Sequence, residues 1–154
     1  MRRVMFVCHG NICRSPMAEF VFRKLVNDEG LGESFVIASS ATSTEELGNP
    51  VYPPVRALLS SRGIDTSGKY AVQLSRADYD CYDLFVGMDS ANVRNMFRIF
   101  GTDPDKRIVK LLDYVGGGDV ADPWYTRDFE ATYRDICRGC KALLENLITV
   151  KTHN

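Results

Sequence analysis

The chain has 154 residues, of which 45% are hydrophobic and 25% charged, enough for one globular domain with a sizeable core. Its net charge of −1 gives no electrostatic reason to expect binding to nucleic acid or to an anionic membrane surface. No apolar run approaches the ~20 residues that span a bilayer, and none resembles a secretory signal, so we expect a soluble, cytoplasmic protein. Five cysteines are an odd number in a chain of this size, so we expect reduced thiols rather than a disulfide framework.

The first predicted element is a short buried strand over residues 4–7, where every side chain is apolar. A loop over residues 8–14 follows. Ser15 and Pro16 are typical of a helix start, with Ser15 as the cap and Pro16 as the first helical residue. Apolar residues at helical spacing continue this helix to a stop near Gly30. The result is a first strand–loop–helix unit.

The middle of the chain repeats this alternation, because short apolar runs are followed by segments with apolar residues at helical spacing. Ser, Thr, Pro and Gly residues separate the segments. The predicted elements are a strand at 35–38, a loop at 39–44, a helix at 53–63, a strand at 82–88, and a helix that Ser90 can cap and that stops at Gly101.

A fourth strand is predicted over residues 108–112. Residues 113–126 contain three consecutive glycines and are expected to form a mobile loop. Apolar residues over 129–148 trace one face of a long last helix. We therefore expect a single domain over residues 1–150 and a frayed tail over residues 151–154.

Four strands that alternate with helices predict a four-stranded parallel sheet flanked by helices, a doubly wound α/β sandwich. Functional sites in such folds lie at the carboxyl ends of the strands. Cys8, the 39–44 loop, Asp89 and the loop after Leu112 all follow predicted strands. We expect these segments to converge on one cleft.

The loop after the first strand has the features of an anion site. A strand-to-helix loop can turn its backbone N–H groups inward at the positive end of a helix dipole. Gly10 and Asn11 suit such a turn because both tolerate positive φ. The N–H groups and the Arg14 guanidinium would favour a Cys8 thiolate, and the guanidinium offers a planar fork for two phosphate oxygens. A nucleophile and an anion clamp would then face one bound group.

The spacing Cys-x5-Arg followed by Ser, at Cys8, Arg14 and Ser15, is the signature of the protein tyrosine phosphatases. The fuller string resembles the low-molecular-weight protein tyrosine phosphatase family in particular, and the likeness covers nearly the whole chain. It implies a phosphotyrosine protein phosphatase I-like fold. That string is Val7-Cys8-x-Gly10-Asn11-x-Cys13-Arg14-Ser15-Pro16-x-Ala18-Glu19.

The resemblance and the residues together predict hydrolysis of phosphotyrosine and other aryl phosphate monoesters. Cys8 would attack phosphorus to give a cysteinyl-phosphate, while Arg14 and the loop N–H groups hold the charge on the oxygens. Asp122 is the candidate general acid, since it matches the aspartate of the family's Asp-Pro-aromatic-Tyr motif. The same carboxylate would then activate the water that releases inorganic phosphate. No metal and no cofactor is expected.

The remaining loop residues are assigned as follows. Ser15 can donate to the Cys8 sulfur as well as cap the helix, and Asn11 either fastens the loop through its amide or serves the turn alone. The resemblance implies a protective Cys8–Cys13 disulfide, whereas Cys13 as a small buried filler is equally compatible with the sequence. The residues predicted to bind phosphate are His9, Gly10, Asn11, Ile12, Cys13 and Arg14.

The predicted cleft has an aromatic wall and an acidic rim. Trp124 and Tyr125 could wall it against a phenyl ring and keep Asp122 in apolar surroundings that favour its protonated form. Where the family often has an aromatic residue after the second strand, this chain has Glu45 and Glu46, which would disfavour acidic phosphopeptides. Trp124 also replaces a commoner tyrosine.

Three alternatives stay open. Thioredoxin-coupled arsenate reductases share the fold and the Cys-x5-Arg loop, and Cys81 lies in roughly the right region for their cysteine relay. Phosphoarginine phosphatases are close relatives that carry threonine where this chain has Ile12, so Ile12 favours phosphotyrosine. The third alternative is an anion-binding module without catalysis, against which the joint presence of Cys8, Arg14 and Asp122 argues.

Overall fold

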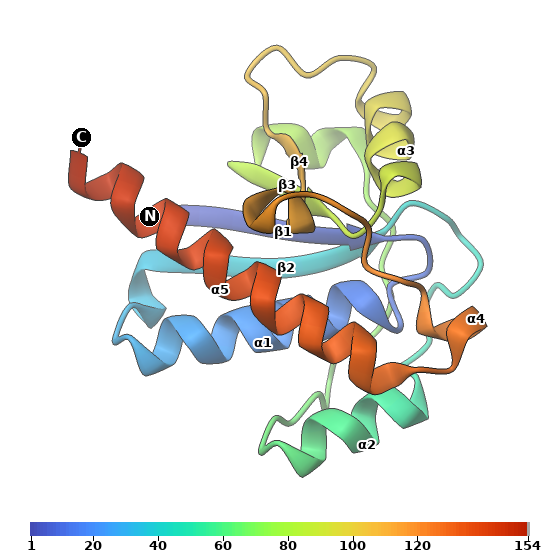
Figure 1. Ribbon diagram of the computed structural model, residues 1–154. Helices are drawn as coiled ribbons and strands as arrows, with labels where there is room; N and C mark the ends of the chain where they lie inside the picture. The colour runs from blue at the N-terminus through green and yellow to red at the C-terminus, as the bar shows by residue number, and fades with distance from the viewer. Residues whose placement is uncertain (154) are drawn as a thin grey trace.

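The computed structural model describes residues 1–153, with side chains as far as residue 149, and Asn154 lies outside the described residues. A sheet runs through the centre of the molecule, with helices on both of its faces (Figure 1). The strands are β1 (Arg2–Cys8), β2 (Phe35–Ala41), β3 (Leu84–Gly87) and β4 (Ile108–Lys110). The α-helices are α1 (Arg14–Asp28), α2 (Pro53–Ser61), α3 (Ser90–Phe100), α4 (Pro123–Thr126) and α5 (Phe129–His153).

The four strands are all parallel and lie in the order β2-β1-β3-β4. In the centre of the sheet, Val4 of β1 is paired with Ile37 on one side and with Leu84 on the other. The predicted doubly wound α/β sandwich with a four-stranded parallel sheet is confirmed. The parallel pairing places the carboxyl ends of β1, β2 and β3 at the same edge of the sheet.

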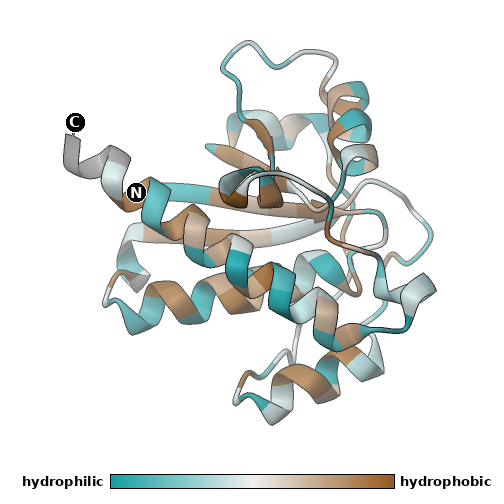
Figure 2. Cartoon of the chain, viewed as in Figure 1, coloured by the Kyte–Doolittle hydropathy of each residue, from teal (hydrophilic) through white to brown (hydrophobic). Residues whose placement is uncertain are grey.

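Alternation along β1 divides the core between the two faces of the sheet. Val4, Phe6 and Cys8 pack in a large cluster with apolar residues of α1 and α5. Met5 and Val7 point to the other face and pack with α3. Apolar residues therefore follow one another along the strands, as Figure 2 shows, because both faces are covered.

Several of the predicted boundaries near the site are wrong; the strand predicted over residues 108–112, for example, ends at Lys110, where a 3₁₀ helix begins. β2 continues through Ser39 and Ser40, which are buried, although the sequence predicts a loop there. Pairing with Cys8 in β1 keeps β2 extended as far as Ala41. α3 is capped by Asp89 rather than by Ser90, since the Asp89 carboxylate accepts the Asn92 N–H at 2.8 Å.

The stretch expected as a mobile loop over residues 113–126 is partly helical. It begins within a 3₁₀ helix (Leu111–Val115) and ends with α4, which Asp122 caps and Pro123 begins. An aspartate followed by a proline is typical of a helix start, and this signal opposes the mobile loop that the three glycines predict. α5 reaches His153, further than the domain boundary predicted at residue 150.

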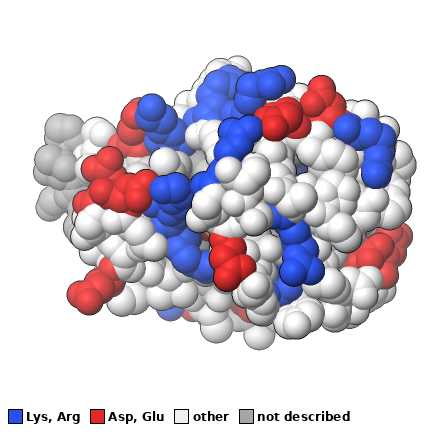
Figure 3. Space-filling view, turned by 90° about the horizontal axis from the view of Figure 1, so that it is seen from below, with Lys and Arg blue, Asp and Glu red and all other residues white. Residues whose placement is uncertain are grey.

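Charged side chains of both signs lie on the surface, and neither positive nor negative charge dominates. On the face drawn in Figure 3, Lys and Arg side chains lie between groups of Asp and Glu side chains. Of the helices in the described part of the chain, none is both long and apolar enough to cross a membrane. That the protein binds neither nucleic acid nor a membrane surface stays a prediction from its charge.

Candidate active site

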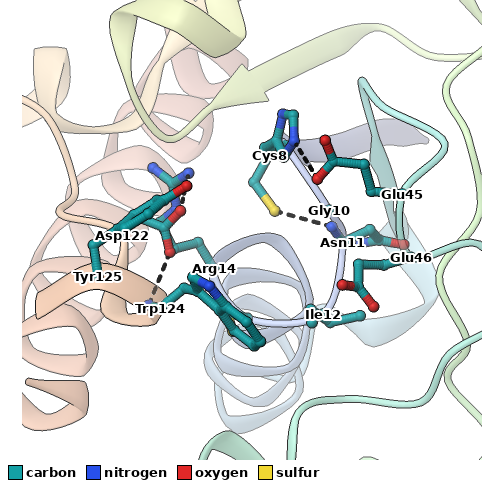
Figure 4. A pocket seen from close by; sticks show the side chains of 12 residues that line it. Cys8, Gly10, Asn11, Ile12, Arg14, Glu45, Glu46, Asp122, Trp124 and Tyr125 are labelled. Carbon is teal, nitrogen blue, oxygen red and sulfur yellow. Dashed lines mark hydrogen bonds and ion pairs between the residues drawn. The ribbon is translucent and has the colours of Figure 1, made fainter. Parts of the chain in front are cut away.

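The loop between β1 and α1 surrounds the sulfur of Cys8 with hydrogen-bond donors. Cys8 ends β1 and is 3% exposed. Its Sγ accepts the backbone N–H groups of Asn11 at 3.3 Å and Ser15 at 3.4 Å, and it lies 3.0 Å from the Ser15 hydroxyl. Figure 4 shows the sulfur pointing into the cavity that the loop encloses. Such donors stabilise a thiolate more than a thiol.

Asn11 holds the loop in this shape. Its φ is +60°, in the left-handed region that asparagine tolerates. Its Nδ2 donates to Ser15 Oγ at 2.7 Å and to Ser39 Oγ at 2.9 Å, while its Oδ1 accepts the Val72 N–H. Gly10 does not have the positive φ that the sequence suggested; instead, a Cβ there would lie 3.3 Å from Glu46 Cγ.

The prediction that Ser15 caps α1 is wrong. The helix begins one residue earlier, at Arg14, and Cys13 occupies the cap position without a side-chain hydrogen bond. Because the Ser15 hydroxyl lies between Cys8 Sγ and Asn11 Nδ2, it belongs to the network around the sulfur.

Arg14 is a buried cation with one arm fixed. Its Nη1 donates to Asp89 Oδ2 at 2.7 Å and to the Val120 carbonyl at 3.0 Å. Burial opposes the charge, but Cys8 and Asp89 together raise the pKa of the guanidinium above its usual value. Its Nη2 lies 3.6 Å from Asp122 Oδ2. The guanidinium is thus positioned between a fixed carboxylate and the cavity.

Asp122 lies on the other side of the same cavity. Its Oδ1 accepts the Trp124 N–H at 3.0 Å, and its side chain is 29% exposed. The apolar surroundings predicted for Asp122 are not what the structure has, because its carboxylate contacts the Arg14 guanidinium and a backbone N–H. Trp124 and Tyr125 line the cavity entrance, with Tyr125 81% exposed (Figure 4).

The acidic rim opposite these rings contacts His9. Glu45 and Glu46 line the cavity, and Glu45 Oε2 lies 3.0 Å from His9 Nε2. His9, Gly10, Ile12 and Cys13 line the same cavity as Cys8 and Arg14. The structure therefore brings every predicted site residue except Ser15 to one cavity, and the Ser15 hydroxyl lies 3.0 Å from the Cys8 sulfur.

Cys13 differs from Cys8 although both are buried free thiols. Burial, with a smaller effect of Cys8, raises the pKa of the Cys13 thiol to about 12. Cys13 is therefore neutral at physiological pH and a poor nucleophile. Among the described residues, no group of three or more His, Cys, Asp or Glu side chains is arranged to hold a metal ion.

Comparisons with known proteins identify the family. The family model of the low molecular weight phosphotyrosine protein phosphatases matches residues 3–152. The chain belongs to this family. Its members are named as protein-tyrosine phosphatases, which are hydrolases of phosphomonoesters.

Individual family members match over almost their full length. The low molecular weight protein-tyrosine-phosphatase YfkJ of Bacillus subtilis is 38% identical over 96% of each chain, and a crystal structure of YfkJ superimposes with a TM-score of 0.93 over 98% of this chain and 97% of that one. The low molecular weight phosphotyrosine protein phosphatase of Rattus norvegicus is 39% identical over 99% of this chain and 96% of its own. The crystal structure of a drosophila arginine phosphatase is 26% identical, with a TM-score of 0.87 over 96% of this chain and 98% of that one.

Several residues that support this phosphatase-family site were missed in the sequence. Asp89 was placed at a strand end but not paired with Arg14. Glu19 is 6% exposed and accepts the Ser39 hydroxyl at 2.6 Å, and Lys69 Nζ donates to the Ser39 carbonyl at 2.9 Å. A glutamate among the apolar residues of the buried helix face was the available signal for Glu19. Nothing local pointed to Lys69.

Proposed function

We propose that this protein is a cytoplasmic phosphatase that hydrolyses phosphotyrosine in proteins and small aryl phosphates without metal or cofactor. One observation carries the proposal: Cys8, Arg14 and Asp122 line one cavity, and the Cys8 sulfur accepts two backbone N–H groups. A nucleophile, an oxyanion clamp and a proton donor are the parts that cleavage of a phosphate monoester needs.

In the first step the Cys8 thiolate attacks phosphorus, and the bond from phosphorus to the phenolic oxygen breaks. Asp122, in its acid form, gives its proton to that oxygen. Because Asp89 and Val120 hold Nη1 of Arg14, Nη2 is the arm on the cavity side that can pair with phosphate oxygens. The products of this step are the phenol and a cysteinyl-phosphate.

In the second step water attacks the cysteinyl-phosphate. The Asp122 carboxylate takes a proton from this water, the S–P bond breaks, and inorganic phosphate leaves. Cys8 departs as a thiolate, which the Ser15 hydroxyl at 3.0 Å and the two N–H groups stabilise. The phosphate-binding loop thus serves both steps with the same donors.

The second part of the proposal is a Cys8–Cys13 disulfide: a peroxide oxidises the Cys8 sulfur to a sulfenic acid, the Cys13 thiol attacks that sulfur and loses its proton, and water leaves. Cys13 lines the same cavity as Cys8 and is a free thiol in this structure. The Cys8 sulfur, which accepts two backbone N–H groups, is the one that is oxidised, and Cys13, whose thiol pKa burial raises to about 12, is the resolving partner.

Phosphoarginine hydrolysis is the second candidate, favoured by the likeness to the drosophila arginine phosphatase. Ile12 lines the cavity with an apolar side chain. The phosphoarginine phosphatases that this chain resembles carry threonine at this position, so Ile12 favours the aryl substrate.

A cysteine relay to Cys81 is less compatible with the fold. Cys81 follows a 3₁₀ helix just before β3, and the next residues bond to Arg3 at the start of β1. Cys8 is at the other end of β1, about 16 Å along the strand at 3.3 Å per residue. We therefore do not propose arsenate reduction.

The test compares the wild type with Cys8→Ser on an aryl phosphate and on phosphoarginine, with EDTA and a reductant present. Aryl phosphate hydrolysis that persists in EDTA and is lost in Cys8→Ser is the expected result. A wild type that hydrolyses only phosphoarginine would select the second candidate. Loss of the wild-type activity in EDTA would contradict the metal-free mechanism.

A further inference from the structure

Helix α4 has only four residues, yet it carries the Asp122 side chain at its cap. One turn of helix is not stable alone and needs tertiary contacts to keep its place. Figure 1 shows α4 near the start of α2 and the start of α5. The side chains at these three helix ends decide how firmly Asp122 is held.

Tyr52 contacts both sides of the cavity. It stands at the cap position of α2, and its backbone N–H donates to the Ile12 carbonyl of the phosphate-binding loop at 2.9 Å. Its ring lies against Trp124 of α4, with centroids 5.0 Å apart, and against Phe129 of α5 at 6.1 Å. One residue therefore joins the Cys8 loop to the helix that follows Asp122.

Arg127, at the other end of α4, also contacts Tyr52. Its φ of +58° lies in the left-handed region, and its N–H donates to the Pro123 carbonyl, ending the helix. An arginine in this conformation has a backbone cost that glycine would avoid. Its guanidinium lies over the Tyr52 ring at 5.5 Å and the Phe129 ring at 5.3 Å, and Nη2 donates to the Tyr52 hydroxyl at 3.1 Å.

We propose that Tyr52 and Arg127 are positioning residues that hold Asp122 at the correct distance from a phosphoryl group on the Cys8 side. The inference rests on the proposed function, since it assigns these residues to the general acid of that reaction. Neither residue lines the cavity. They act through α4, whose cap is Asp122, and not on the substrate.

The kinetic test uses two aryl phosphates that differ in their need for a proton. Phenyl phosphate has a poor leaving group, whereas 2,4-dinitrophenyl phosphate releases a phenolate that needs little protonation. With Arg127→Met or Tyr52→Leu, we expect kcat/KM for phenyl phosphate to fall roughly fivefold or more and that for the dinitrophenyl ester by less than about twofold. Equal losses on both substrates would overturn the inference.

Two further variants separate positioning from general damage. Tyr52→Phe keeps the ring contacts and loses only the hydrogen bond from Arg127 to the hydroxyl, so it should destabilise the fold less than Tyr52→Leu. Its loss of kcat/KM for phenyl phosphate should be smaller but again greater than that for the dinitrophenyl ester. Arg62→Met is the matched control. Arg62 also lies over a ring, that of Tyr133 at 4.9 Å, and pairs with Glu130, but no contact joins it to α4. Its leaving-group dependence should equal that of the wild type.

The fluorescence of Trp124, the single tryptophan of the chain, reports on α4 without any substrate. Arg127→Met and Tyr52→Leu should lower its emission anisotropy, and Arg62→Met should not. If the wild type hydrolyses no aryl phosphate, the proposed function fails, and a fall in anisotropy still supports the link from Tyr52 and Arg127 to α4. Unchanged anisotropy in both variants would overturn it.

Discussion

The two sides of the cavity are built differently. On the loop side, Cys8, Asn11, Arg14 and Ser15 are at most 3% exposed and are joined by hydrogen bonds to β2 and to α3's cap. On the acid side, Asp122 is 29% exposed, and the aromatic residues after it are exposed as well. The loop side is part of the core, whereas the acid side lies on the surface and packs against it.

Because of this difference, changes on the two sides should have different effects on stability and on activity. A change in the loop network breaks buried hydrogen bonds, so it should affect both the free energy of unfolding and the reaction. A change on the acid side should affect the reaction with little effect on stability, because few buried groups lose a partner. Each of the following variants tests one side of this contrast.

The largest effect is expected on the acid side. Asp122→Ala should lower kcat/KM for phenyl phosphate by about 10²-fold or more, and less for esters with good leaving groups. Its free energy of unfolding should change by no more than about 1 kcal/mol, the value of an exposed helix cap. Steady-state kinetics and urea unfolding measure both. Full activity of Asp122→Ala on phenyl phosphate would remove this residue from the mechanism.

On the loop side, Asn11→Ala should lose both properties. It removes two buried hydrogen bonds and a partly buried one and leaves an alanine at φ +60°, for an expected loss of about 2–4 kcal/mol of stability. Asn11→Gly is the matched control, since it loses the same bonds but keeps the backbone conformation, and should recover about 1 kcal/mol. A stable but inactive Asn11→Ala would contradict the coupling of stability and activity on this side.

The pKa of Cys13 predicts a loss of stability at alkaline pH. The folded-state pKa is about 12 against an ordinary 9.0, so above pH 9.0 the unfolded chain loses this proton while the folded chain keeps it. The free energy of unfolding therefore falls as pH rises between these values, by at most about 1.4 kcal/mol per pH unit. Urea unfolding near pH 8 and pH 10 should show a smaller fall for Cys13→Ala than for the wild type. The exposed Cys81→Ala should keep the wild-type fall.

The smallest effect is expected at the exposed rim. Glu45→Gln removes one charge beside the cavity entrance and leaves His9 without its acidic partner. We expect kcat/KM for phosphopeptides with acidic neighbours to rise about two- to fivefold relative to those with basic neighbours, an effect that salt reduces. The same ratio in wild type and variant would show that the rim does not select the substrate.

The contrast also explains what could be predicted from the sequence. The loop side is encoded in one contiguous string, so Cys8, Arg14 and the anion-binding turn could be predicted from local chemistry. The sheet followed from the alternation of apolar runs. Ser15 was predicted both to contact the Cys8 sulfur and to cap the helix. The first role is found, and the second is not, because α1 begins one residue earlier, at Arg14.

The acid side depends on contacts between distant segments. The ion pair of Asp122 with Arg14 joins residues that are far apart in the sequence, and the Arg127–Tyr52 bond spans 75 positions. No periodicity or spacing signals such pairs. Asp122 could be predicted only through its motif, and its ionic surroundings could not, since Arg14 approaches it from another element.

The central claim is that Cys8, and not Cys13, carries the phosphoryl group. In Asp122→Ala, 2,4-dinitrophenyl phosphate should still phosphorylate the enzyme, while the loss of the base slows hydrolysis of the intermediate. Mass spectrometry after rapid acid quenching should then find one phosphoryl group on Cys8. A phosphoryl group on Cys13, or turnover without any phosphorylated cysteine, would contradict the account.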